Sequence, residues 1–247
     1  MTSIATSITV GTADLRQALT AVTVHASTDG ELPDIARVRL TIGPDHVFVT
    51  ATDRFTAALA HVSTWDHDGE PFEIVELLVD DAAKLLRIFK VHGKDDGDAP
   101  QYTLRLDVAH DEVTATDSSG FDIIGRRFRM PRLETAVTLN GVPALFERAH
   151  LGQIVLLDSA SSMVVSGKML ARFKVAATVY DEPLAMETRS GHRKGSASVL
   201  IRCGESFLGL IVPRQLVDEE AARAREWAQG WTARLPELLD VSRGEGQ

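Results

Sequence analysis

The chain has 247 residues, of which 44% are hydrophobic and 25% are charged, and its formal net charge is −9. This composition allows a sizeable core in one large or two small domains and excludes a largely disordered chain. The negative net charge argues against a dedicated nucleic-acid binder unless the positive charges are gathered on one face.

The single cysteine, Cys203, lies in an apolar strand pattern and cannot form an internal disulfide or a cysteine cluster that binds metal. No apolar run approaches the roughly 20 residues that a membrane-spanning helix needs. The N-terminus lacks the basic-then-apolar order of a signal peptide. We therefore expect a cytoplasmic protein without a membrane partner.

The first part of the chain alternates between apolar and polar residues, interrupted by one helical pattern. Thr12 is the predicted N-cap of the helix and Asp14 lies in its first turn, where a negative charge suits the helix dipole. The buried stripe of this helix is expected at Leu15, Ala18, Leu19 and Val22. The predicted elements are a strand at 4–10, a helix at 12–26, strands at 37–42, 47–53 and 55–62, and a polar stretch at 63–70 that closes the unit.

The second part repeats this order. The sequence Val-Thr-Ala-Thr-Asp occurs at 49–53 and again at 113–117, each time after an alternating strand pattern and, further upstream, a helical pattern. An internal repeat of this kind predicts that one strand-helix-strands unit is used at least twice. The predicted elements are strands at 72–78, 101–108, 112–117 and 121–129, a helix at 79–91 and a linker at 130–135.

The last part is shorter. Pro143 suits the first turn of a helix that runs to about Ala149, and Ser166 is the predicted N-cap of a helix that buries Met169, Leu170 and Phe173. The remaining predicted elements are short strands at 137–139 and 153–157, strands at 184–188, 197–203 and 207–212, and a charged helical tail at 218–239 with Trp227 and Trp231.

Basic residues recur on the predicted solvent faces of these helices and in the segments beside them. If the helices face one way, these residues could contact DNA phosphates without reading sequence, which would permit sliding. The alternative is that they only solvate exposed helix faces. The candidates are Lys84, Arg87, Lys90, Lys94, Arg148, Lys168, Arg172 and Lys174, and the strongest four are Lys84, Arg87, Lys168 and Arg172.

Motifs of common enzyme classes are missing from the sequence. It contains no nucleophile elbow, dinucleotide-binding glycine motif or phosphate-binding loop, and its eight histidines show no metal-ligand spacing. Asp53 and Asp117 occupy equivalent repeat positions, which favours a turn-forming role over paired catalysis. We expect no enzymatic activity, no cofactor and no metal site.

The order of these elements resembles the bacterial DNA polymerase sliding clamp. The resemblance rests on Ala51-Thr52-Asp53, the helix at 80–89, the strand that ends Phe128-Arg129-Met130-Pro131, and the strand that closes on 211–216. It implies an α+β DNA clamp fold in which helices lie on one face of antiparallel sheets. Residues 1–135 are similar to the middle domain of these clamps and residues 136–217 to a shortened last domain, while the tail, 218–247, has no counterpart.

Members of this family close rings of six domains around duplex DNA and tether polymerases to it. The resemblance therefore implies double-stranded DNA as a partner and, with two domains per chain, a homotrimer. It also implies a pocket for peptides of DNA polymerase and the clamp loader, formed by Thr52, Arg54, Phe55, Pro131, Leu210, Val212, Pro213, Arg214 and Leu216.

Several alternatives to this function remain. The chain has Arg54-Phe55-Thr56-Ala57 where the family has Gly-His-Arg-Leu, so the pocket residues could instead close a domain interface. The shortened last domain is compatible with a clamp-like adapter that binds proteins without encircling DNA. An enzyme on an unrelated repeat fold is a third possibility. The tail can dock as an amphipathic helix, on its own protomer or on a partner.

Overall fold

A computed structural model describes residues 4–91, 102–120, 125–154, 164–190, 197–214 and 216–244. They fall into two compact bodies. The larger body comprises Met1–Val155 and Ser166–Val212, and the smaller body comprises Leu156–Val165 and Pro213–Gln247. Residues from both predicted domains, 1–135 and 136–217, contribute to the larger body.

The larger body contains three copies of one motif, a helix followed by three strands. Repeat 1 is β1 (Ile4–Gly11), α1 (Thr12–Thr23), β2 (Arg37–Ile42), β3 (His46–Thr52) and β4 (Thr56–Gly69). Repeat 2 is β5 (Glu73–Leu78), α2 (Val79–Ile88), β6 (Thr103–Ala109), β7 (Glu112–Asp117) and β8 (Arg127–Pro131). Repeat 3 is α4 (Gly167–Tyr180), β9 (Leu184–Ser190), β10 (Ala197–Cys203) and β11 (Phe207–Ile211). The predicted repetition is confirmed: the second copy of the repeated sequence lies in β7, and the first lies in β3 except for Asp53, which follows the strand.

All strand pairs among the described residues are antiparallel, and the long strand β4 joins repeat 1 to repeat 3. Its first half pairs with β3 on one edge and with β11 on the other, where Leu59 lies opposite Leu208. Its second half pairs with β1, where His67 lies opposite Ile8. Strands β5, β2 and β3 extend the sheet from one side of β4, while β1, β6, β7 and β8 extend it from the other.

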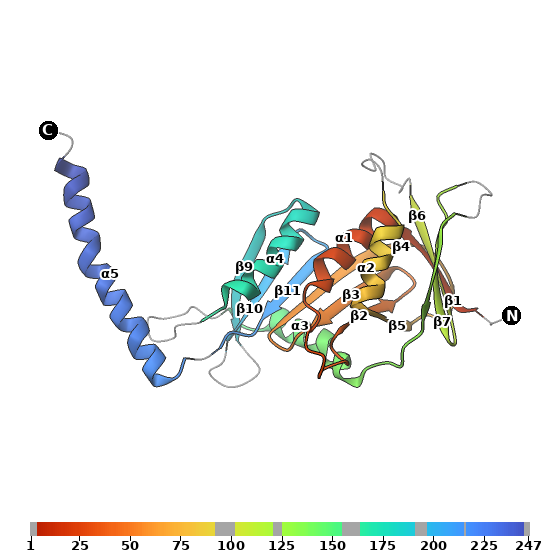
Figure 1. Ribbon diagram of the computed structural model, residues 1–247, viewed down its shortest axis with the longest axis horizontal. Coiled ribbons are helices and arrows are strands. Elements are labelled where there is room, and N and C mark those ends of the chain that lie inside the picture. The colour runs from red at the N-terminus through yellow and green to blue at the C-terminus, as the bar shows by residue number, and fades with distance from the viewer. Residues whose placement is uncertain are drawn as a thin grey trace. The chain divides into compact units, whose positions relative to one another are not determined.

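The helices of the three repeats form a row on one face of the strands, with α1 between α4 and α2 (Figure 1). The predicted buried stripe of α1 is confirmed, because Leu15, Ala18, Leu19 and Val22 are fully buried. Asp14 lies in the first turn as predicted, but Thr12 is the first helical residue and Gly11 is the N-cap. Ser166 caps α4 as predicted by accepting a hydrogen bond from the backbone of Lys168.

The opposite face of the strands is covered by a 3-10 helix, η1 (Val137–Gly141), and by α3 (Val142–Leu151). Leu139 and Phe146 of these helices pack with Ala57 of β4 and Leu210 of β11 in one buried cluster. On β11, the neighbouring Gly209 faces the other way, since a Cβ placed there would lie 2.2 Å from the ring of Phe173 in α4. Because neighbouring strand residues point to opposite faces, α3 and α4 lie on opposite sides of the sheet.

The predicted strand at 137–139 is wrong. Ala136, Leu139 and Val142 are buried whereas Val137 is exposed. A spacing of three residues aligns side chains along a 3-10 helix, since residues i and i+3 are eclipsed there. The apolar residues therefore reach the sheet from a helical turn rather than from a strand.

Three other expectations are corrected. The polar stretch at 63–70 is mostly strand, because β4 continues to Gly69. Its polar side chains are half exposed or exposed, and its backbone pairs with β1. Met130 and Pro131 belong to β8 rather than to the linker. Leu170 is exposed, although Phe173 of the same helix is buried as predicted.

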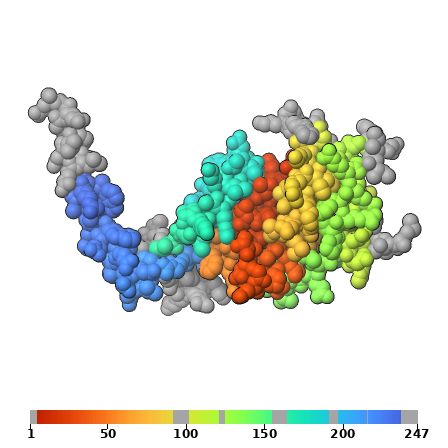
Figure 2. All heavy atoms as spheres, in the orientation of Figure 1, coloured from red at the N-terminus to blue at the C-terminus, as the bar shows by residue number. Residues whose placement is uncertain are grey.

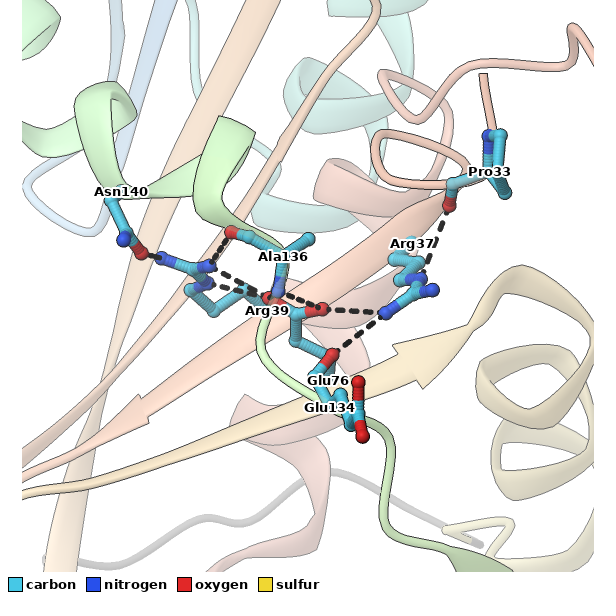
Figure 3. Close-up of polar contacts among 7 residues, drawn as sticks. All are labelled: Pro33, Arg37, Arg39, Glu76, Glu134, Ala136 and Asn140. Atoms are coloured by element: carbon cyan, nitrogen blue, oxygen red, sulfur yellow. Dashed lines mark hydrogen bonds and ion pairs between the residues drawn. The ribbon is translucent and has the colours of Figure 1, made fainter. Parts of the chain in front are cut away.

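A buried ion pair ties the linker before η1 to the sheet (Figure 3). Arg39 of β2 lies opposite Glu76 of β5, and its Nη2 atom is 2.7 Å from Oε1 of Glu76. Glu76 also accepts hydrogen bonds from Arg37 at 3.1 Å and from the backbone nitrogen of Ala136 at 3.0 Å. The Arg39 guanidinium donates in turn to Asn140 Oδ1 at 2.7 Å and to the Ala136 carbonyl at 2.6 Å. Charge and hydrogen bonding are thus satisfied on both partners, as burial of ions requires.

The smaller body contains α5 (Asp218–Gly244), which confirms the predicted helical tail and extends beyond its predicted end. Arg214 pairs with Glu220 at 2.7 Å near the start of this helix. Trp227, Trp231 and Leu235 are exposed and recur at a spacing of four residues, which places them on one side of the helix. Among the described residues, no helix has the length and apolarity that a membrane crossing requires.

Candidate nucleic-acid interface

Polar contacts fix α1 between its two neighbours. On one side, Arg16 donates to the carbonyls of Leu86 and Phe89 at the end of α2, the latter at 2.7 Å. On the other side, Gln17 donates to the Val179 carbonyl of α4 at 3.0 Å. The last carbonyls of a helix have no partner within the helix, so these side chains satisfy them and hold the row together.

Basic side chains are exposed on the two outer helices of this row, which form one continuous surface with α1 (Figure 2). Lys84 and Arg87 are exposed on α2, and Lys168 and Lys174 are exposed on α4. Lys90 is exposed just beyond Phe89, the C-cap of α2. We call Lys84, Arg87, Lys90, Lys168 and Lys174 the basic helix face. Helices α2 and α4 lie on the same face of the strands, and DNA binding by these residues remains a prediction.

One member of the basic helix face has an acidic neighbour. Lys84 pairs with Asp81 at 2.8 Å, one turn away on α2. The Lys84 side chain is half exposed, whereas Asp81 is buried. The ammonium group of Lys84 therefore remains accessible to solvent.

Arg172 is placed differently from the other basic residues of α4. Its guanidinium forms an ion pair with Asp53, in the turn between β3 and β4, and donates to Thr56 Oγ1 at 2.8 Å. Burial opposes the ionisation of Asp53. Hydrogen bonds from the Thr56 backbone and from Arg172 outweigh this effect and lower the pKa of the Asp53 carboxyl. Arg172 thus connects α4 to repeat 1, a role that the sequence pattern did not indicate.

One further DNA-binding candidate lies on another helix. Arg148 is on α3, on the opposite side of the sheet from α1, α2 and α4, so the prediction that it shares their face is wrong. Nothing in the sequence indicated which face of the sheet α3 covers. Lys94 lies outside the described residues.

A buried histidine adjoins the Arg172 contact. Nδ1 of His25 lies 3.1 Å from Thr56 Oγ1, and its ring centroid is 4.5 Å from that of Phe173. Its Nε2 has no hydrogen-bond partner among the described residues. Burial, reinforced by the nearby positive charge of Arg172 and opposed by Asp53, lowers the pKa of His25 to about 3. His25 is therefore neutral at physiological pH.

The residues predicted to bind partner peptides are distributed over both bodies, and their role remains a prediction. Thr52, Arg54 and Phe55 lie at the turn between β3 and β4, and the Val212 nitrogen donates to the Phe55 carbonyl at 2.8 Å. Phe55 and Val212 are about half exposed. Arg54 has a φ of 79° and is held there by a bond from its nitrogen to Thr52 Oγ1.

The other predicted partner-binding residues have different environments. Leu210 lies opposite Ala57, close to this turn, and its side chain belongs to the buried apolar cluster under η1 and α3. Pro131 lies at the end of β8, opposite Glu112. Pro213, Arg214 and Leu216 belong to the smaller body.

Sequence reasoning missed the buried pair of Arg39 and Glu76. A signal was present, because each charged residue interrupts an apolar strand pattern, Val38-Arg39-Leu40 and Val75-Glu76-Leu77. Opposite charges in the middle of two apolar strands predict a cross-strand ion pair once the strands are known to be neighbours. Among the residues that the structure describes, no cluster of His, Cys, Asp or Glu is suited to a metal ion.

No protein-family model matches the sequence, and no curated protein is similar to it. Solved structures do match. The DNA polymerase III beta subunit of Thermotoga maritima aligns with 87% of this chain at a TM-score of 0.60 and 13% identity. DNA polymerase sliding clamps from Pseudomonas aeruginosa and Bacillus subtilis align with 87% and 85% of this chain, at TM-scores of 0.59 and 0.53 and identities of 10% and 15%.

The aligned region covers only part of each neighbour: 66% of the Thermotoga maritima chain, 68% of the Pseudomonas aeruginosa chain and 64% of the Bacillus subtilis chain. At these identities the likeness shows the fold alone. The chain has the fold of bacterial sliding clamps and spans about two thirds of their length.

Proposed function

We propose that this chain, which has the fold of bacterial sliding clamps, is itself a non-enzymatic DNA clamp that surrounds duplex DNA and holds partner proteins on it. The observation that carries the proposal is the basic helix face. Three helices lie in a row, and the outer two expose Lys84, Arg87, Lys168 and Lys174.

The charge distribution supports DNA as the partner. The chain as a whole has a net charge of −9, yet its exposed helix row carries a concentration of lysine and arginine. Contacts to phosphates do not depend on base sequence, and such contacts allow a protein to slide. A negative protein with one positive face binds DNA through that face and is repelled elsewhere.

The proposal is tested with two triple variants of equal charge change. The first, Lys84→Ala/Arg87→Ala/Lys168→Ala, removes three charges from the basic helix face. The second removes Arg127, Arg129 and Arg148, which lie on the opposite side of the strands. Arg126 donates to the Ile88 carbonyl of α2, so Arg127 and Arg129 point to the other face of the sheet, and Arg148 is on α3.

Binding to duplex DNA is measured by fluorescence anisotropy over a range of salt concentrations. Each lost phosphate contact lowers the slope of log K against log salt by about 0.9. We expect the first triple variant to lose about 3 units of slope if all three residues contact phosphates, and the second to lose less than one. Equal slopes for the two variants would refute the assignment of the DNA-binding face.

The partner-binding part of the proposal is centred on the turn between β3 and β4. Phe55 and Val212 are exposed apolar residues joined by a backbone hydrogen bond, and both lie near the end of the sheet where β11 meets β4. Peptides of a DNA polymerase or clamp loader are the expected ligands. Phe55→Ala should weaken binding of such a peptide at least tenfold, measured by calorimetry, whereas Phe72→Ala, an exposed phenylalanine before β5, should leave it unchanged.

A clamp-like adapter that does not encircle DNA is the second candidate. The observation that favours it is the odd number of repeats among the described residues. Repeats 1 and 2 form a pair, whereas no fourth repeat lies beside repeat 3 in this part of the chain. A chain that remains monomeric and binds a partner peptide without DNA would support the adapter. The homotrimer expected from the sequence assumed two complete domains per chain and remains a prediction.

A further inference from the structure

Two histidines meet on the strand pair of β3 and β4. His46 is the first residue of β3 and lies opposite Ser63 of β4. His61 of β4 lies opposite Phe48 of β3. The two histidines are therefore diagonal neighbours on one face of the strands, a position from which long side chains reach each other. Their ring centroids are 5.4 Å apart.

The face that carries the two rings is the one on which α3 packs. Leu59 of β4 packs against the apolar cluster under η1 and α3, and His61 follows it two residues later on the same side of the strand. His61 is half buried and His46 is exposed, so solvent reaches both residues. The pair lies on the opposite side of the sheet from the basic helix face and is independent of the proposed function.

The orientation of the His61 ring determines which of its nitrogens can bind a metal. Its Nε2 atom lies 3.1 Å from the carbonyl oxygen of Glu205, in the turn between β10 and β11. A carbonyl oxygen only accepts hydrogen bonds, so Nε2 carries the proton and Nδ1 of the neutral ring has the lone pair. Histidines that bind metals are oriented in this way, by a hydrogen bond from the second nitrogen to a carbonyl or a carboxylate.

The backbone holds His61 against the same turn. Its nitrogen donates to the carbonyl of Ser206 at 3.1 Å. At the other histidine, the carbonyl of His46 accepts a hydrogen bond from the Gly43 nitrogen at 2.9 Å, which closes the turn between β2 and β3. Both histidines are thus attached to ordered backbone, and the register of β3 and β4 fixes their separation.

The separation of the two rings fits a shared metal ion. Imidazole nitrogens lie about 2.0–2.1 Å from zinc, so two imidazoles on one tetrahedral zinc have ring centroids about 5 Å apart. The observed 5.4 Å is close to this value. An edge-to-face aromatic contact is the alternative explanation, since the interplanar angle is 70°. Only a metal site binds zinc, so a titration separates the two explanations.

We propose that His46 and His61 bind one divalent transition-metal ion of the zinc class, with water in the remaining coordination positions. Imidazole is a preferred ligand of zinc, copper and nickel, whereas magnesium prefers oxygen ligands. The site is a pair of ligands, smaller than a cluster of three or more His, Cys, Asp or Glu, which does not occur among the described residues. The bound ion joins β3 to β4.

This site was not expected from the spacing of the histidines in the sequence. A helical metal motif places its ligands a few residues apart, so consecutive residues reveal it. His46 and His61 belong to different strands and become neighbours only through the pairing of β3 with β4.

The test is a calorimetric titration of the full chain with Zn²⁺, near neutral pH in a buffer that does not chelate metals. His46→Ala and His61→Ala each remove one ligand. Each should weaken binding by at least about 10-fold, because loss of a group that only orients a ligand already costs about that much. His110→Ala is the matched control, since His110 is exposed in the turn between β6 and β7, and it should bind Zn²⁺ as the wild type does.

Two further measurements make the result specific to the histidine pair. Mg²⁺ in the same titration should give no binding that depends on His46 or His61, which separates imidazole ligands from general attraction of cations to a chain of net charge −9. Zn²⁺ should raise the unfolding temperature of the wild type and of the His110 variant more than that of the two ligand variants, because the ion binds the folded strand pair.

Circular dichroism checks that the variants stay folded, which is expected because neither His46 nor His61 is fully buried. A wild type that does not bind Zn²⁺ would overturn the proposal, and so would ligand variants that bind it as tightly as the wild type. A chain that binds Zn²⁺ through the histidine pair but does not bind DNA would contradict the proposed function alone.

Discussion

Arg172 of α4 forms an ion pair with Asp53 in the turn between β3 and β4. The sequence suggested separate roles for these residues, a phosphate contact for the arginine and a turn for the aspartate. Asp53 does stabilise its turn, because its carboxylate accepts hydrogen bonds from the backbone nitrogens of Phe55 and Thr56 at 3.1 and 2.7 Å. The pair links repeat 3 to repeat 1, so its main effect is expected on stability.

Arg172→Ala should lower the free energy of unfolding by about 1–3 kcal/mol, because it removes a charged donor from the partly buried Asp53. Lys168→Ala is the matched control on the same helix, since Lys168 is exposed, and should change stability by less than about 0.5 kcal/mol. Urea unfolding measures both. If the two variants unfolded at the same urea concentration, the structural role of Arg172 would be refuted.

The ion pair of Arg39 and Glu76 predicts a larger effect. Glu76→Gln leaves Arg39 buried without a counter-charge, and loss of one partner of a buried pair costs about 3–5 kcal/mol. The backbone nitrogen of Ala136, which donates to Glu76, should exchange its hydrogen faster in this variant. Denaturant unfolding and hydrogen exchange measure the two effects.

Glu73→Gln is the control for this prediction. Glu73 lies on the same strand and pairs with Arg132, but both side chains are partly exposed. Its replacement should cost about 1 kcal/mol or less. A Glu76 variant no less stable than the Glu73 variant would show that the buried network does not anchor the linker.

The cluster under α3 predicts that this helix is a fixed part of the protomer. Phe146→Ala removes a buried ring from the contact with Ala57 and Leu210 and should destabilise the fold by about 3–5 kcal/mol. Leu145→Ala, at a neighbouring residue that is partly exposed, should cost much less. Thermal unfolding distinguishes them, and equal losses would mean that α3 is not packed on the sheet.

The neutral His25 predicts a loss of stability in acid. Its pKa is about 3 in the folded protein and about 6.5 in an unfolded chain, so between these values the unfolded state binds more protons. Stability should therefore fall as the pH drops from about 6.5 towards 3, by at most about 1.4 kcal/mol for each pH unit from this group. The lowered pKa of Asp53 acts in the same direction, since protonation of its carboxyl weakens the pair with Arg172.

His25→Gln should flatten this pH dependence while lowering stability at pH 7. The matched control is His61→Gln, because His61 is only half buried and bonds to the Glu205 carbonyl. Unfolding by urea at several pH values gives the slopes. A His25 variant as acid-sensitive as the wild type would contradict the assignment.

Local patterns determined which elements could be predicted. The repeated Val-Thr-Ala-Thr-Asp sequence correctly marked β3 and β7, and helical spacing correctly marked α1, α2 and α4. A period of two or of 3.6 residues is a property of consecutive residues, so it can be read without knowing the fold. The repeated unit and the sliding-clamp fold followed from these elements in order.

The errors concern relations between distant residues. The sequence does not show on which side of the sheet α3 packs, so Arg148 could not be separated from the basic helix face. Leu170 fits a buried stripe, yet it is 40% exposed on α4. Leu139 reads as part of a short strand, although its burial depends on a sheet formed by residues far away in sequence.

The measurement that tests the clamp account most directly is the lifetime of the protein on linear duplex DNA with free or blocked ends. The protein is first threaded onto DNA that carries biotin at both ends, and streptavidin is then added to half of the sample. We predict that blocked ends prolong retention at moderate salt, because a ring that surrounds DNA leaves only by sliding off an end. Equal dissociation rates with free and blocked ends would contradict the account.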